Sequence, residues 1–324
     1  MKRLLFAIVG GLLITTGCNK SSSSHDEKTA PEDDQLVTMR NCAAQDVLEE
    51  QLKADASLRD RMDAIEEFTQ RFTQNPDAQR LVNGVIEIPV VVNVLYRTAA
   101  QNISQAQIQS QIDVLNEDFS ATNSDYNLTS TYNSVKSGNI GVRFVLDQVV
   151  RRSTAKTSWS TNDAMKKSAQ GITPTSPTTK LNLWVCNLGG GILGYAQFPG
   201  GNSATDGVVI DDNACGRTGT AAAPFNKGRT ATHEIGHWMN LRHIWGDATC
   251  GNDQVGDTPT HNTANYGCPA AGHRSTCSGT PIEMTMNYMD YTDDGCMYMF
   301  SAGQKTRMLA VFASGGPRNS FAQP

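Results

Sequence analysis

Two histidines and a glutamate lie together in residues 233–237, whose sequence is His-Glu-Ile-Gly-His. Residues four apart in a helix project from the same face, so His233 and His237 can bind one metal ion from a rigid support. Glu234 lies beside the first histidine and can take a proton from a metal-activated water molecule. A catalytic zinc site needs three protein ligands and one open position. His243 can supply the third ligand if the helix ends and the chain turns back.

The turn that this arrangement requires is expected at Asn240. A reversal this sharp favours a left-handed backbone conformation, which glycine adopts freely and asparagine adopts next best. The helix is therefore predicted to begin near Gly228 and to stop at Asn240. An isolated His-Glu-x-x-His pattern arises by chance in some helices, and the third histidine at this offset distinguishes the segment from such cases.

Together with its surroundings, this segment resembles the long zinc signature of the metzincin peptidases, which usually has glycine where this chain has Asn240. Residues 287–291 (Asn-Tyr-Met-Asp-Tyr) resemble the Met-turn that lies beneath the metal in metzincins. With residues 242–247 (Arg-His-Ile-Trp-Gly-Asp), the combination most resembles the pappalysin (M43) family, in particular its cytophagalysin-like bacterial branch. The resemblance runs from about Val85 to Arg318.

The resemblance implies a zinc endopeptidase that hydrolyses peptide bonds in proteins or peptides. The three histidines would hold zinc, and Glu234 would take the proton of the attacking water and pass it to the leaving amine. By resemblance, Tyr291 would stabilise the tetrahedral intermediate, and Met289 would pack under the metal without binding it.

Three other functions are compatible with parts of the pattern. A catalytically silent surface binding protein with a retained zinc site is disfavoured by the open metal position. A gluzincin-type peptidase, with glutamate as third ligand, is disfavoured by the spacing of His243. A carbohydrate-binding or adhesive lipoprotein would need a repeat or an aromatic platform, which the sequence lacks.

The residue after the cut is expected to meet an apolar pocket. In metzincins the segment after the Met-turn lines this pocket, and some relatives that prefer basic residues have aspartate directly after its last cysteine. This chain has Met297 there, a flexible apolar side chain. Burying a substrate arginine against it without a counter-charge would be costly. Asp293 and Asp294 are near in sequence and could turn inward, but a solvated loop is the expected place for them, so the sequence predicts cleavage before medium-sized apolar residues.

Six of the eight cysteines fall after residue 80, and an even count in an exported chain implies disulfides, although spacing alone allows fifteen pairings. The resemblance implies the bridges Cys250–Cys277 and Cys268–Cys296, and leaves Cys186 and Cys215 as a third candidate pair.

Residues 246–295 are expected to consist mostly of turns held by these bridges. Asp253, Asp257 and Thr258 offer the oxygen ligands that calcium prefers. The resemblance implies calcium near this loop, and a solvated acidic turn is the alternative.

Residues 1–17 are predicted to be a signal peptide, with a charged start and an apolar core too short to span a bilayer. The end of this stretch resembles a bacterial lipoprotein cleavage site, which would attach the chain to a membrane through a lipidated Cys18. Thr15 stands where leucine is usual, so ordinary secretion is the alternative. Residues 18–35 are rich in serine and acids and should form a flexible tether. We expect an exported, extracellular or cell-surface protein.

Residues 36–80 are predicted to be a helical propeptide that lies on the enzyme, making the precursor a zymogen with a processing site near Arg80. The segment is too short for a core of its own. A thiolate from Cys42 can occupy the open metal position, and a free or paired cysteine is the alternative. Apolar residues recur here at spacings of three and four: Leu58, Met62, Ile65, Phe68 and Phe72.

Residues 81–324 are predicted to form a metzincin-like α/β catalytic domain. We expect a twisted five-stranded sheet, a backing helix, the zinc helix, and then a loop-rich, disulfide-bonded C-terminal subdomain. One strand, at residues 192–198, can pair with an extended substrate. The expected strands are residues 85–96, 140–150, 181–186, 192–198 and 207–210, and the other helices are residues 104–119 and 303–313.

A formal net charge of −5 and the absence of a basic stripe argue against nucleic acid as a partner. We expect a monomer. Outside the zinc motif, His25, His261 and His273 are expected to be ordinary surface residues.

Overall fold

The computed structural model of this protein describes residues 37–75, 84–167 and 169–322. These residues belong to one compact unit, Leu36–Pro324. The predicted signal peptide, the tether with Cys18, His25 and the processing site near Arg80 lie outside the described residues. Within the part of the chain that is described, no helix is long and apolar enough to cross a membrane.

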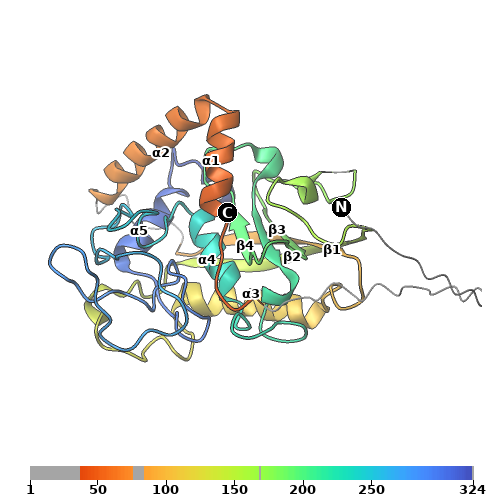
Figure 1. The fold of residues 1–324 in the computed structure, drawn as a ribbon. Helices are drawn as coiled ribbons and strands as arrows, with labels where there is room; N and C mark the ends of the chain where they lie inside the picture. The colour runs from red at the N-terminus through yellow and green to blue at the C-terminus, as the bar shows by residue number, and fades with distance from the viewer. Residues whose placement is uncertain (1–36, 76–83, 168, 323–324) are drawn as a thin grey trace, which may run out of the picture. The chain divides into compact units, whose positions relative to one another are not determined.

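A five-stranded sheet in the order β2-β1-β3-β5-β4 forms the centre of the fold (Figure 1). Four strands are parallel, and the edge strand β4 runs antiparallel to β5. Valine and isoleucine are common in the strands because β-branched side chains pack well in the central strands, which are buried on both faces, whereas the edge strand β2 is partly exposed. The strands are β1 Ile86–Tyr96, β2 Val142–Ser153, β3 Leu181–Cys186, β4 Gly194–Ala196 and β5 Val208–Asp211.

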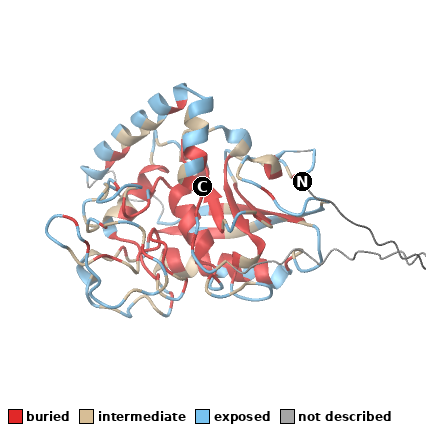
Figure 2. Ribbon diagram, in the orientation of Figure 1, coloured by how far each residue is buried: buried red, intermediate tan, exposed pale blue. Residues whose placement is uncertain are grey.

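Helices α3 and α4 pack against the sheet and against each other, whereas α2 packs against α5. Figure 2 shows burial concentrated in the sheet and in the helices on it, while α2 has an exposed outer face. The α-helices are α1 Ala44–Ala54, α2 Ser57–Thr73, α3 Gln105–Ser120, α4 Arg229–Trp238 and α5 Ala302–Ala310. Short 3-10 helices cover Asn133–Val135, Ala164–Lys166, Ser203–Thr205, Asp212–Ala214 and Asn319–Ala322.

The predicted α/β fold class is confirmed, with small differences in element lengths. The backing helix α3 starts after Ser104, whose hydroxyl accepts a hydrogen bond from the backbone N–H of Gln107 at 3.1 Å, as an N-cap should. Strand β2 continues three residues beyond Val150, and β4 is shorter than residues 192–198. Residues 37–75, called the N-terminal segment below, contain α1 and α2.

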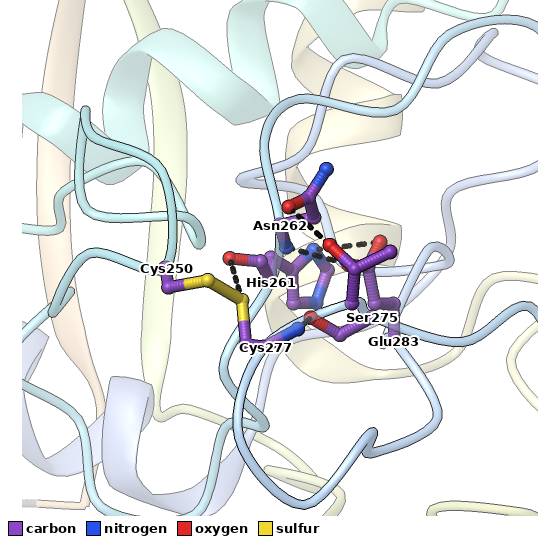
Figure 3. Close-up of a disulfide and its surroundings, with 7 residues drawn as sticks. Cys250, His261, Asn262, Ser275, Cys277 and Glu283 are labelled. Carbon is purple, nitrogen blue, oxygen red and sulfur yellow. Dashed lines mark hydrogen bonds and ion pairs between the residues drawn. A yellow bond between two sulfur atoms is a disulfide. The ribbon is translucent and has the colours of Figure 1, made fainter.

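The chain between α4 and α5 has no regular helix or strand among the assigned elements and is held by two disulfides. Cys250–Cys277 and Cys268–Cys296 are both present, as the resemblance implies. Figure 3 shows the first of them beside His261, whose carbonyl oxygen lies 3.5 Å from the sulfur of Cys277. Two disulfides therefore restrain this loop, where strand pairing restrains the sheet.

The third candidate disulfide is wrong, because Cys186 and Cys215 are both free, buried thiols. Successive residues of a strand point to opposite faces of a sheet. Cys186 belongs to the smaller apolar cluster, with Trp184 and Trp159, whereas Cys215 belongs to the main cluster on the other face. The sheet itself separates the two sulfur atoms.

Candidate metal centre and active site

Helix α4 starts and stops at two residues with left-handed backbone. Its N-cap Gly228 has φ 75°, and Asn240, just beyond its end, has φ 71°. The N–H of Leu241 donates to the carbonyl of Gly236 at 2.9 Å and so closes the turn. The chain reverses where asparagine was expected to allow it, and the residues that follow return toward the helix.

The two histidines of α4 are fixed through their Nδ1 atoms. His233 Nδ1 lies 2.6 Å from the carbonyl oxygen of Tyr288, and His237 Nδ1 lies 2.8 Å from that of Leu241. A carbonyl oxygen only accepts, so each Nδ1 carries the hydrogen and each Nε2 keeps a free lone pair. Backbone contacts thus prepare both rings as metal ligands.

His243 is fixed by a carboxylate that sequence reasoning did not single out. Its Nδ1 lies 2.5 Å from an oxygen of Asp247, four residues later. The ring of Trp245 stacks on the His243 ring at 4.4 Å with an interplanar angle of 9°. The sequence did offer a signal for this carboxylate, because residues 242–247 support the family resemblance. Asp247, the last residue of that stretch, was given no role there.

The ligand atoms of the three histidines and Cys42 all lie within 4.8 Å of one another. The Nε2 atom of His237 is 3.2 Å from that of His233 and 3.1 Å from that of His243. Burial, with the neighbouring imidazoles, lowers the pKa of His233 well below its usual value and that of His237 to about 3. Three imidazoles and one thiol match the nitrogen and sulfur donors of a tetrahedral zinc site, so these residues fit that metal.

Glu234 lies beside this centre and is fully buried. Burial raises the pKa of its carboxyl to about 8, and the thiol of Cys42 donates to Oε2 at 3.3 Å. A Cβ added at Gly194 of β4 would come within 2.9 Å of the Glu234 Cγ atom. A glycine on the edge strand therefore leaves the space that the carboxyl group occupies.

The Met-turn residues lie beneath and beside the histidines. A Cβ at Gly236 would come within 2.4 Å of the Met289 sulfur, so the turn is packed directly under α4. The Tyr291 ring is 5.0 Å from the His243 ring, and its hydroxyl donates to the carbonyl of Cys42 at 3.0 Å. The expected site residues of both segments are thus brought together.

Residues 182–313 match the family of M43 peptidases described as pregnancy-associated plasma protein-A. An extracellular metalloprotease of Verticillium alfalfae is 34% identical over 239 residues, covering 70% of this chain and 78% of that protein. Another, from Pyricularia oryzae, is 36% identical over 233 residues and covers 69% and 72%. The chain belongs to the M43 (pappalysin) family of metalloproteases.

Two solved structures agree with the M43 assignment. Mature mirolysin of Tannerella forsythia, in complex with a cleaved peptide, is 44% identical, with a TM-score of 0.71 over 74% of this chain and 96% of that one. A promirolysin mutant is 40% identical, with a TM-score of 0.78 over 87% and 97%. The promirolysin structure, which is that of a precursor, covers a larger share of this chain than the mature one does.

In this M43 protease the N-terminal segment pairs with strand β4. The carbonyl of Asn41 accepts from the N–H of Leu193 at 2.9 Å, and the N–H of Ala43 donates to the carbonyl of Gly194 at 3.0 Å. Cys42 and Gly194 form a parallel bridge. The edge strand therefore binds an extended segment through backbone hydrogen bonds, which is the manner expected for substrate.

The expected apolar pocket is contradicted by Arg40. Its guanidinium forms a buried ion pair with Asp294 at 2.5 Å, donates to Thr292 and Thr230, and lies over the Phe225 ring. Asp294 is completely buried, not solvated, because it also accepts from the backbone N–H groups of residues 227 and 229. Met297 is completely buried within the main apolar core. An acid therefore meets a basic side chain near the metal centre.

The predicted calcium-binding side chains bind protein groups. The Asp253 carboxylate accepts from the Thr258 hydroxyl at 2.8 Å. Asp257 accepts from the Ser301 hydroxyl and the Gly303 N–H, so it supports the start of α5. Asp253 and Thr258 therefore bind each other, whereas Asp257 binds residues at the start of α5.

The expectation for His261 is wrong, because its side chain is completely buried, whereas His273 is exposed as expected. The Nε2 atom of His261 accepts from the N–H of Met284 at 2.9 Å. Its Nδ1 faces Asp290 at 3.5 Å and Glu283 at 3.8 Å. The ring orders the loop beneath the Met-turn.

Proposed function

We propose that this protein is a zinc-dependent endopeptidase that cleaves before basic residues, and that residues 36–80 are a propeptide that keeps it latent. The observation that carries the proposal is the path of Arg40 to Cys42. The arginine enters a buried acidic pocket, and the cysteine points its thiol at three convergent imidazoles. The segment lies across the proposed active site with a basic side chain in the acidic pocket, and it runs opposite to a substrate whose basic residue follows the cut.

His233, His237 and His243 are proposed to hold the zinc. A zinc ion there supplies a Lewis acid that polarises the scissile carbonyl and acidifies water. Glu234 takes the proton from the attacking water and returns it to the leaving amine. Its position supports this role, because Oε2 lies 3.3 Å from the Cys42 sulfur, which faces the three imidazoles where the water would bind. Tyr291 is proposed to donate its hydroxyl hydrogen to the oxygen that becomes negative, once Cys42 has left that position.

Asp294 is proposed to select a basic side chain for the residue after the cut. A guanidinium fits the pocket because its hydrogens are matched by the Asp294 carboxylate, the Thr292 carbonyl and the Thr230 hydroxyl. This preference replaces the apolar one expected from Met297. The same preference would place the maturation cut before Arg80, which shortens the propeptide to residues 36–79, one residue ahead of the boundary expected at residues 80 and 81.

Cys42 is proposed to maintain latency by occupying the fourth position at the metal. Its pKa is raised well above its usual value by burial and by Glu234, and a bound cation would favour the thiolate. The proposal also includes export through residues 1–17, attachment through Cys18 and a monomeric state. It further includes calcium bound at Asp253, Asp257 and Thr258. The relatives from Verticillium alfalfae and Pyricularia oryzae are extracellular metalloproteases, which supports export.

The experiment is a digest of casein by the processed protein, with and without a chelator, followed by mass spectrometry of the cut sites. We expect cleavage that the chelator abolishes, with arginine or lysine after most cuts. The Asp294→Ala variant should lose that preference, and Asp293→Ala, at the neighbouring half-buried acid, should retain it. Cleavage that resists the chelator would contradict the metal mechanism, and cuts without a basic preference would contradict the role of Asp294.

A further inference from the structure

A cavity of about 370 Å³ lies between the N-terminal segment and the rest of the protease. Helices α1 and α2 form its roof through Leu48, Leu52, Met62 and Ile65. Its floor consists of four residues that follow β4 and α4, which are Phe198, Pro199, Asn240 and Arg242. Removal of the N-terminal segment would turn this floor into an open groove.

The groove floor begins at the metal centre. The Phe198 ring lies 5.3 Å from the ring of His237. Asn240 and Arg242 lie between His237 and His243 in the chain, so the floor is part of the turn that carries the third histidine. A substrate bound at the metal would therefore run directly over these residues.

The N-terminal segment indicates which end of a substrate reaches the floor. The segment starts with Arg40 at Asp294, passes the histidines at Cys42, and continues into the helix that roofs the cavity. The floor therefore lies across the metal from the Asp294 pocket. If the residue after the cut enters that pocket, the residues before the cut lie over the floor.

Glu66, one of the residues that line the cavity, is held by an ion pair. The Arg307 guanidinium of α5 donates to both carboxylate oxygens of Glu66 of α2, at 2.9 Å and 2.5 Å, and its Nε donates to the Asn240 carbonyl at 2.7 Å. Burial alone would raise the pKa of Glu66, yet Arg307 and the charge of Arg242 hold it below its usual value. Two cations of the protease thus face one acid of the segment that is proposed to leave.

We propose that in the processed protease Arg307 and Arg242 form a subsite for an acidic side chain of the substrate, on the side before the cut. This inference rests on the proposed function, because it requires the N-terminal segment to depart. Glu66 fills the subsite in the precursor as Arg40 fills the Asp294 pocket. Once Glu66 departs, the Arg307 fork, held in place by Asn240, presents its two terminal nitrogens to a carboxylate.

The length of the roof locates the subsite along the substrate. Helix α1 starts at Ala44, two residues after Cys42 in the segment that bridges to β4. At about 3.3 Å per extended residue and about 1.5 Å per helical residue, Leu48 lies roughly 12 Å along the path from Cys42. An extended peptide covers about 3.3 Å per residue. The floor is therefore within reach of roughly the second to fourth residue before the cut.

Paired fluorogenic peptides test the subsite in the processed protein. Each pair has arginine after the cut and differs only by glutamate or glutamine at the second, third or fourth residue before it. We expect kcat/KM to be roughly five- to tenfold higher for glutamate at one of these positions, about the effect of a well-formed ion pair. Because departure of the N-terminal segment would open the subsite to solvent, the ratio should fall at high salt.

Two variants and one control assign the effect. Arg307→Gln and Arg242→Gln should each bring the ratio toward one, and the second leaves the hydrogen bond to Asn240 intact. Lys305→Gln, on the same helix but bonded to the Asn139 carbonyl, should keep the wild-type ratio. Equal cleavage of both peptides by the wild type would overturn the subsite and leave the protease function standing. Failure to cleave any peptide would overturn the proposed function itself.

Discussion

Two buried clusters of this protein combine histidine with carboxylates, and they differ in which ring nitrogen is already used. At the metal centre each Nδ1 is held by a backbone carbonyl or by Asp247. The three Nε2 atoms therefore point toward one another, and no backbone N–H group in the described part of the chain occupies their lone pairs. Beneath the Met-turn, the Nε2 of His261 accepts from a backbone N–H, and Nδ1 faces Asp290 and Glu283. Residue type alone thus does not make a metal site, because the backbone decides which nitrogen remains free.

The second cluster is also cross-linked by an amide. The Asn265 side chain donates to Glu283 at 2.7 Å and to Asp290 at 2.9 Å. The N–H of Tyr291 donates to Asp290 as well. This cluster therefore holds the Met-turn and its tyrosine in place, while the first cluster is built for chemistry.

The largest effect should come from removing the acid at the metal centre. Glu234→Ala should lower kcat/KM by about 10³-fold, within the usual contribution of a general base. Zinc content after dialysis should stay at the wild-type level, since all three histidines remain. Peptide cleavage at the wild-type rate by this variant would exclude Glu234 as the base.

A smaller effect, on zinc affinity, should follow from freeing the His243 ring, which is held by the Asp247 side chain and not by the backbone. Asp247→Ala removes the partner of His243 Nδ1 and should weaken zinc affinity by roughly 10- to 100-fold. A competition titration with a chelating dye measures this change. Asp113→Ala, at an exposed position of α3 outside the metal centre, serves as the control. Unchanged affinity in the first variant would show that Trp245 stacking alone orients the ring.

The second cluster should respond in stability. His261→Ala leaves the Met284 N–H and two carboxyl groups without their buried partner, and should cost about 2–4 kcal/mol of unfolding free energy. Urea unfolding of the zinc-loaded protein measures it, and zinc stoichiometry should not change. His273→Ala, at the exposed histidine nearby, should cost far less. If His261→Ala lost zinc but kept its stability, the His261 cluster would have to serve metal binding, and its assigned role in stability would be wrong.

Latency should respond to the thiol that covers the metal centre. Cys42→Ala should activate the precursor several-fold faster than wild type, because the fourth metal position is no longer filled. Appearance of the mature N-terminus, expected at Arg80, is followed by mass spectrometry. Cys186→Ala tests another buried free thiol, and its activation should match wild type. Identical rates for both variants would exclude a role for the Cys42 sulfur.

The smallest effect concerns pH. Burial raises the pKa of Asp290 to about 7 and lowers that of His261 to about 4. The raised pKa gives stability at low pH that is lost as pH rises toward 7, whereas the lowered pKa gives stability that is lost as pH falls from about 6.5 toward 4. The two effects oppose each other, so the wild type should vary little between these values.

Asp290→Asn should remove the first effect only. The Tm of this variant minus that of the wild type should therefore increase by roughly a few degrees from pH 4 to pH 7. Asp113→Asn, at an exposed helix position, should give a difference independent of pH. A constant difference for Asp290→Asn would show that its carboxyl is charged throughout this range.

Much of the metal centre could be predicted because its spacing is local. His233 and His237 share a helix face, and Asn240 marks the turn in the sequence itself. Contacts between distant residues could not be predicted in this way. Asp294 is 254 residues from Arg40, and no periodicity indicates that they meet. The separation of Cys186 from Cys215 likewise depends on which face of the sheet each residue occupies.

The short strand β4 has a consequence for the protein after processing. It is an edge strand, and in the precursor residues 41–43 cover its backbone groups. Unpaired strand edges recruit other chains and promote aggregation. The N-terminal segment therefore also protects an adhesive edge until the enzyme is needed. Because β4 has three residues, the edge that a mature molecule exposes is too short to template a stable sheet between molecules, and long enough to hold one peptide.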